Sequence, residues 1–236
     1  MYSGEKNPQL NRIDCYKMEV VNRIICRTSS SPLLANYCRH WNSTVACTLF
    51  TREGDDGWSV TSTGEKRPKD DRIFNAIGAT DELSSYIGLA REFAKDGEHT
   101  YTDKLKRIQC ILVDISASIL KSCQPEQQVQ LSSRHTKDLE EWIEEYSRQL
   151  PPLEKYVIPG GGKACTSLHV ARTICRRAER CVVPLVRNGE VDKEAQVYLN
   201  RLSDFLLTIS RFACKIDKKN ESIYIPRPDE ELVSKT

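Results

Sequence analysis

Three arginines recur at every fourth position in one stretch of the chain, at Arg172, Arg176 and Arg180. A helix rises about 1.5 Å per residue and brings residues four apart onto one face, so the three guanidinium groups would lie along about 12 Å of that face. Such a row is commonly a solvated or ion-paired helix face. Here no acidic residue stands four positions away from any of the three, so the like charges repel and an anion is expected opposite. A polyphosphate matches this length and charge, and guanidinium forks suit phosphate oxygens.

A second stretch that could contact an anion is residues 51–71. It contains glycines, hydroxyl side chains and Lys69 just before a predicted helix, and small residues let backbone N–H groups approach a phosphate. By itself this pattern is weak, because a glycine-containing turn before a helix is ordinarily only a turn. A third stretch, Pro159-Gly-Gly-Gly-Lys163, does not complete a Walker A loop, because Val157 and Ala164 stand where that motif needs Gly and Ser or Thr. A P-loop ATPase is therefore excluded.

The sequence lacks the residues that several other kinds of site would need. No Glu-x-x-His motif is present, which excludes a ferritin-like di-iron site, and the four histidines are widely separated. The ten cysteines include no Cys-x-x-Cys pair, so we expect reduced thiols rather than zinc or redox sites. Lys and Arg total 35 against 33 Asp and Glu, a balance that argues against a nucleic-acid binder. No run approaches the roughly 20 apolar residues of a membrane-spanning helix.

The elements that must position these residues are predicted to be helices. Apolar residues recur at three- and four-residue steps, the period that places them on one helical face, in five stretches: 73–93, 105–119, 139–150, 163–186 and 193–216. Gly97 ends the first stretch, Pro151 and Pro152 end the third, and Asn188 with Gly189 caps the fourth. A short extended piece is expected around 223–225. We therefore predict an all-α protein, a five-helix up-and-down bundle.

The last predicted helix carries a wide apolar belt. The belt covers more than half of its circumference and consists of Ala195, Tyr198, Leu199, Leu202, Phe205, Leu206, Ile209, Phe212 and Ala213. A helix in a single bundle needs only an apolar stripe, so this width indicates burial on two sides. The second side could be the bundle centre or another subunit.

The first fifty residues have a different composition. Residues 20–50 contain no Asp or Glu, and their arginines stand among serines, which is typical of an organellar transit peptide. Initiation at Met18 rather than Met1 would give a cleaner presequence; the alternative is an N-terminal tail with no targeting role. The predicted organisation is a transit peptide or disordered leader, a helical-bundle domain and a disordered tail, over residues 1–47, 48–226 and 227–236.

Together these segments resemble the PduO-type ATP:cob(I)alamin adenosyltransferases, the family that makes adenosylcobalamin. The resemblance runs from about Leu49 to Ile225 and rests on blocks that occur in one order: TREGDDGWS, TGEKRPKDD, ATDELSSYIG, YVIPGGG, LHVARTICRRAERCVVPL and LNRLSDFL. It implies a ferritin-like five-helix bundle that forms a homotrimer, with active sites between subunits. For a chain with such a leader, it implies a location in the mitochondrial matrix.

The resemblance also implies roles for individual residues. Those implied to contact ATP are Thr51, Arg52, Glu53, Gly54, Ser59, Val60, Lys69, Arg176, Arg177, Glu179, Arg180 and Asn200. Tyr156 and Asp204 are implied to face the corrin, and Asp81 is implied to pair with Arg172 across the subunit interface. The implied catalytic residues are Arg176, Arg180 and Tyr156.

Two residues depart from the family pattern. Arg52 stands where the family usually has Lys, which exchanges a point charge for a fork. Tyr156 stands where the family commonly has Phe, and this adds a hydroxyl to a surface that is expected to be dry. A buried hydroxyl without a partner costs on the order of 1–3 kcal/mol, so we expect this one to find a partner or to point to solvent.

The implied reaction is attack of the cobalt of cob(I)alamin on C5′ of ATP, with triphosphate as the leaving group. Arg176, Arg180 and Lys69, together with a Mg²⁺ ion bound through the ATP phosphates, would stabilise the charge that develops on triphosphate. The resemblance also implies a cobalamin reductase and a methylmalonyl-CoA mutase system as partners. The alternative function is a non-catalytic cobalamin escort that delivers the cofactor to a mutase.

Overall fold

The computed structural model describes residues 52, 54–61, 64–121, 130–153 and 155–225. The chain divides into two compact units, residues 1–56 and 57–236. In the first unit, the structure describes Arg52 and residues 54–56. The Asp55 N–H donates to the Arg52 carbonyl oxygen at 3.2 Å. The predicted leader (1–47) and tail (227–236) lie outside the described residues. Every helix within the described residues belongs to the second unit.

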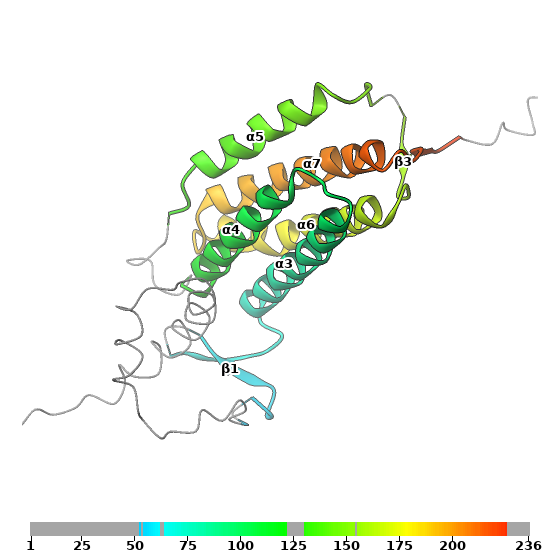
Figure 1. The fold of residues 1–236 in the computed structure, drawn as a ribbon. Coiled ribbons are helices and arrows are strands. Elements are labelled where there is room, and N and C mark those ends of the chain that lie inside the picture. Colours follow the sequence, from blue (N-terminus) through cyan, green and yellow to red (C-terminus); the bar gives the residue numbers. More distant parts are fainter. Residues whose placement is uncertain (1–51, 53, 62–63, 122–129, 154, 226–236) are drawn as a thin grey trace, which may run out of the picture. The chain divides into compact units, whose positions relative to one another are not determined.

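Five α-helices account for most of the described part of this unit (Figure 1). They are α3 (Arg72–Asp96), α4 (Thr102–Leu120), α5 (Arg134–Ser147), α6 (Lys163–Arg187) and α7 (Lys193–Ile216). The prediction of an all-α protein with five helices is confirmed. The largest difference in bounds is at α5, which begins before Leu139 and ends before Leu150. Its first turn carries mostly polar side chains, so the apolar period could not reveal it.

Side chains and glycines mark the helix ends. The Asp71 carboxylate caps α3 by accepting from the Ile73 N–H at 2.8 Å, and the Asp192 carboxylate caps α7 by accepting from the Glu194 N–H at 3.2 Å. An N-terminal cap of this kind satisfies a helical N–H that has no intrahelical partner. Two predicted ends are also confirmed, since α3 stops before Gly97 and α6 stops before Asn188, whereas α5 ends at Ser147, ahead of the two prolines.

The helices pack in the order α4, α3, α6, α7, α5. Helix α6 packs against both α3 and α7, α4 covers α3, and α5 covers α7 (Figure 1). Side chains also join α4 to α5, because the Lys104 ammonium lies 2.6 Å from a Glu145 carboxylate oxygen. All nine apolar belt residues of α7 are buried within the single chain. Of the two explanations left open by the sequence, the bundle centre therefore accounts for the belt.

Two short antiparallel ribbons lie outside the helices. The first pairs β1 (Trp58–Val60) with β2 (Lys66–Pro68), directly before α3. The second pairs β3 (Val157–Ile158) with β4 (Ser222–Ile223), so that residues just before α6 meet residues just after α7. The extended piece predicted around 223–225 overlaps β4. No helix among the described residues is long and apolar enough to cross a membrane.

Candidate active site

The arginine row lies on α6, as its spacing predicted. Arg176 and Arg180 are exposed and Arg172 is half-buried. None of the three forms a salt bridge with any residue that the structure describes. Among the described residues, no carboxylate pairs with this row of positive charge. A row of unpaired positive charges can hold a polyanion.

Helix α7 adds a polar pair beside this row. The Asn200 side-chain amide donates to a Glu179 carboxylate oxygen at 3.0 Å, which joins α7 to α6. Glu179 follows Arg176 by three residues, so both lie on one face of α6. The structure thus brings together four of the residues predicted to contact ATP, Arg176, Glu179, Arg180 and Asn200. Arg177 lies on another side of α6, where its guanidinium forms an ion pair with Glu82 of α3.

The predicted N-terminal ATP loop is described in part. Ser59 and Val60 lie on β1, and Ser59 is opposite Arg67 of β2. The exposed Lys69 follows β2, and its N–H donates to the Gly57 carbonyl oxygen at 2.9 Å. This hairpin was missed by the sequence reasoning, which interpreted the segment as a loop. Of the remaining predicted residues, Arg52 and Gly54 belong to the first unit, while Thr51 and Glu53 lie outside the described residues.

Tyr156 begins the ribbon that β3 and β4 form at one end of the bundle. Its carbonyl oxygen accepts from the Tyr224 N–H at 2.9 Å, which extends the pairing of the two strands. Tyr156 is 67% exposed in the single chain, so it is not buried there. Ile158 and Tyr224 are exposed on the same face of the ribbon as Tyr156, whereas the exposed Ile223 and Ile225 lie on its other face. The ribbon therefore offers an apolar surface that could cover a flat, apolar ligand face.

The glycines between β3 and α6 are required by close packing. Gly161 and Gly162 have φ angles of +84° and +113°, a conformation that favours glycine. A Cβ added at Gly161 would lie 2.5 Å from the Cys214 sulfur. This loop thus lets α6 begin directly against the end of α7, and its glycines have a structural explanation that needs no phosphate.

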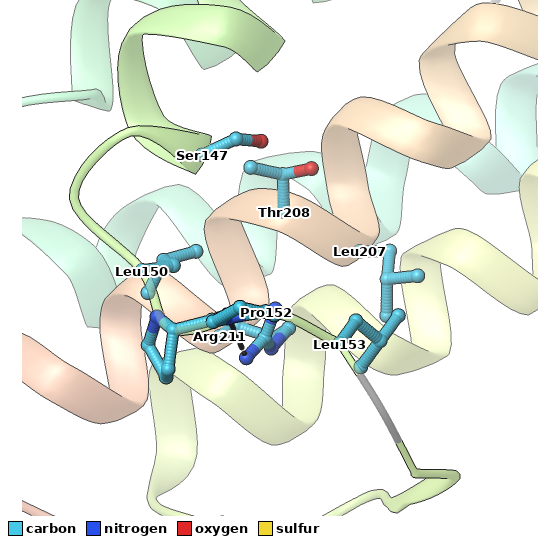
Figure 2. A pocket seen from close by; sticks show the side chains of 8 residues that line it. Ser147, Leu150, Pro152, Leu153, Leu207, Thr208 and Arg211 are labelled. Carbon is cyan, nitrogen blue, oxygen red and sulfur yellow. Dashed lines mark hydrogen bonds between the residues drawn. The ribbon is translucent and has the colours of Figure 1, made fainter.

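Asp204 lies on the exposed face of α7, where its carboxylate accepts from Arg201 at 2.9 Å. One turn further along α7, Leu207, Thr208 and Arg211 form one wall of a pocket of about 340 Å³ (Figure 2). The other wall comes from the end of α5 and the segment after it: Ser147, Leu150, Pro151, Pro152 and Leu153. Sequence reasoning missed this pocket, because the only signal was a pair of prolines that it used to end a helix.

Asp81 and Arg172 form no ion pair with each other or with another described residue. Partial burial raises the pKa of Asp81 above its usual range, an effect that its hydrogen bond with Ser116 opposes. The Nε atom of Arg172 is buried and has no hydrogen-bond partner in the described part of the chain, and neither has Nδ1 of the neighbouring His169. Tyr198 Oη, in the core on α7, is likewise buried without a hydrogen-bond partner among the described residues.

The cysteines that the structure describes are free thiols: Cys110, Cys165, Cys175, Cys181 and Cys214. Burial raises the pKa of the Cys165 thiol to about 12, and it raises the pKa of Cys175 as well. These buried thiols are unreactive packing residues. Within the described residues, no group of three or more His, Cys, Asp or Glu side chains is placed to hold a metal ion.

Comparison with known proteins matches residues 49–213 to the cobalamin adenosyltransferase family. Corrinoid adenosyltransferase MMAB from Homo sapiens is 45% identical over 182 residues, which cover 75% of this chain and 73% of that protein. Corrinoid adenosyltransferase from Bacillus subtilis (strain 168) is 36% identical over 165 residues, 69% of this chain and 84% of that protein. The chain belongs to the cobalamin adenosyltransferase family.

Solved structures of cobalamin adenosyltransferases share the same fold. A variant of the PduO-type ATP:corrinoid adenosyltransferase from Lactobacillus reuteri, complexed with cobalamin and ATP, superposes with a TM-score of 0.72. It is 29% identical, and the match covers 76% of this chain and 100% of that chain. Another variant of that enzyme, complexed with ATP, superposes with a TM-score of 0.70 over 75% of this chain and 100% of that chain. The resemblance inferred from the sequence blocks is thereby confirmed.

Proposed function

We propose that this corrinoid adenosyltransferase moves the 5′-deoxyadenosyl group of ATP to the cobalt of cob(I)alamin. The cobalt attacks C5′ of the ribose, a cobalt–carbon bond forms, and the C5′–oxygen bond breaks with its electron pair going to triphosphate. The products are adenosylcobalamin and triphosphate. The observation that carries the proposal is the uncompensated row of Arg172, Arg176 and Arg180 on α6, beside the Glu179–Asn200 pair.

The electrostatic part of the mechanism follows from the leaving group. Negative charge grows on the oxygen that leaves C5′, and fixed positive charges that face this oxygen lower the barrier. Arg176 and Arg180 are exposed on one face of α6 and are the residues we assign to this role, with Lys69 as a further charge. Glu179 of α6 and Asn200 of α7 bring a carboxylate and an amide beside these arginines, and such oxygens suit a hard cation, so Mg²⁺ would be held here through the ATP phosphates.

Tyr156 and Asp204 are the residues we assign to the corrin. Tyr156, Ile158 and Tyr224, on one face of the β3–β4 ribbon, would lie against the lower face of the corrin and keep water and a lower ligand away from cobalt. Burial of this surface against the ligand would leave the Tyr156 hydroxyl at its edge. The pocket beyond Asp204 on α7 has the volume to accept a peripheral group of the same ligand.

We propose that the active form is a homotrimer in which Asp81 of one subunit pairs with Arg172 of another. Three observations on the single chain support this pairing. Asp81 and Arg172 form no ion pair among the described residues, partial burial already raises the pKa of Asp81, and Arg172 Nε is buried without a partner. An aspartate brought against this arginine would stabilise both charges, because each is partly removed from water.

We also propose that the protein works in the mitochondrial matrix. The acid-free, arginine-containing segment within residues 1–47 supports import, while 48–226 would be the working domain and 227–236 a tail. A cobalamin reductase would supply cob(I)alamin, and a methylmalonyl-CoA mutase would receive the product. Sequencing the N-terminus of the mature protein from cells tests this, since residues 1–40 found intact in the cell would contradict removal of a targeting leader.

The function is tested by mixing purified protein, ATP, Mg²⁺ and chemically reduced cobalamin without oxygen. We expect the absorption spectrum of adenosylcobalamin to appear, with one triphosphate released for each adenosyl group transferred. No spectral change, with cobalamin and ATP both bound, would contradict the transfer reaction and favour an escort role.

A further inference from the structure

Arg211 of α7 is buried, with 8% of its surface exposed. Among the described residues, no other lysine, arginine, aspartate or glutamate is buried. The Arg211 Nε donates to a Glu221 carboxylate oxygen at 2.8 Å, and the Arg211 Nη2 donates to the other oxygen at 3.4 Å. The same Nη2 donates to the Pro151 carbonyl oxygen at 3.0 Å (Figure 2). A buried cation is costly unless it is paired and hydrogen-bonded, so these bonds strongly restrict where the two partners can lie.

The two partners lie on the two segments that lead into the β3–β4 ribbon. Glu221 directly precedes β4, and Pro151 lies in the connection from α5 to β3. Each strand of the ribbon has only two residues, and an isolated two-stranded ribbon is marginally stable at best. The ribbon therefore depends on its flanking segments for its position, and Arg211 anchors both of them to α7.

We propose that Arg211 is a positioning residue that places Tyr156 against the corrin. This inference rests on the proposed function, in which Tyr156 faces that ligand. Arg211 acts through Glu221 and Pro151 and not on the reacting atoms. The role suits arginine because its planar fork donates in two directions at once, whereas a lysine ammonium cannot reproduce that fixed geometry.

The first test is Glu221→Ala in the full chain. It removes the carboxylate that joins Arg211 to β4 and leaves Tyr156 intact. We expect hydrogen exchange at the Tyr224 amide, which bonds to the Tyr156 carbonyl oxygen, to become about tenfold faster. We also expect the KM for cob(I)alamin to rise about tenfold while the KM for ATP stays within about twofold, because Arg176 and Arg180 lie on α6 and Asn200 lies about three turns before Arg211 on α7.

Glu144→Ala is the matched control. It removes an ion pair of the same type, Arg148–Glu144 at 3.1 Å, whose side chains are 78% and 70% exposed. An exposed pair contributes little, so this variant should leave both KM values and the Tyr224 exchange rate unchanged.

A second variant separates positioning from stability. Glu221→Ala leaves a buried, partly unpaired cation, so part of its effect could come from a less stable fold. The double variant Arg211→Met with Glu221→Gln removes both charges from the same site, and we expect its thermal midpoint to exceed that of Glu221→Ala. Its anchor is still absent, so the KM for cob(I)alamin should stay raised. A wild-type KM for cob(I)alamin in this double variant would overturn the proposal.

The readouts also separate this proposal from the proposed function. If the wild-type chain transfers no adenosyl group, the proposed function fails, and the placement of Tyr156 against a corrin fails with it. In that case the exchange rates still show whether Arg211 anchors the ribbon. If the wild type is active, unchanged exchange at Tyr224 in Glu221→Ala overturns the anchor. Faster exchange with an unchanged KM for cob(I)alamin overturns its role in positioning.

Discussion

Replacing Gly161 by alanine tests whether the glycine loop before α6 is required by packing. Gly161 has a φ of +84°, a region that costs an L-residue about 1 kcal/mol. The added Cβ would lie 2.5 Å from the Cys214 sulfur and 3.3 Å from the Cys214 Cβ. Inserting a group into a filled site of this kind costs about 1–3 kcal/mol. We therefore expect Gly161→Ala to lower the free energy of unfolding by about 2–4 kcal/mol.

Two further variants separate the backbone part of this free-energy cost from the steric part. Gly189 has a φ of +73°, and no described atom lies within 4 Å of a Cβ added there, so Gly189→Ala should lose only the backbone part, about 1 kcal/mol. Adding Cys214→Ala to Gly161→Ala removes the sulfur that the new methyl group meets. A double-mutant cycle should then show a coupling of about 1–3 kcal/mol between positions 161 and 214.

The assay is urea unfolding followed by far-UV circular dichroism, at one protein concentration for all variants. The reasoning would be refuted if Gly161→Ala cost no more than Gly189→Ala. It would also be refuted if Cys214→Ala did not relieve the cost of Gly161→Ala. Either result would mean that the loop shifts freely and that contact with α7 does not require the glycine.

Three other predictions concern charge. Arg176→Ala should lower kcat about 10²–10³-fold, because it removes one group proposed to stabilise the leaving triphosphate, while size-exclusion chromatography still shows the proposed trimer; near wild-type turnover would exclude the role. Asp81→Ala should shift the trimer toward smaller species in sedimentation experiments, and unchanged assembly together with unchanged activity would count against its pairing with Arg172. Burial, aided by the Arg172 charge, lowers the pKa of His169, so the unfolded chain takes up a proton at higher pH than the folded chain. Stability should therefore fall as pH drops through about 6.5 towards the lower folded value, and urea unfolding at pH 7.5 and 5.5 should show a smaller drop for His169→Asn.

Much of the fold could be predicted because apolar side chains repeat with the helical period. The nine belt residues of α7 are buried as predicted. The first turn of α5 was missed because it is mostly polar, and β3 was missed because two residues carry no detectable alternation. The width of the α7 belt does not identify the surface that buries it, because the same apolar residues could pack against a neighbouring helix or a second subunit.

For the candidate site, the sequence itself determined the contents of one helix face. The spacing of Arg172, Arg176 and Arg180 follows from local helical geometry, and the sequence blocks carried the resemblance to the family. Only the tertiary structure decided which distant residues meet: Glu179 with Asn200, and Arg211 with its two partners. The physical reason is the distance along the chain over which each interaction acts. A helical period is set by bonds four residues apart, whereas contacts between elements depend on how many side chains pack together, and no single segment contains that information.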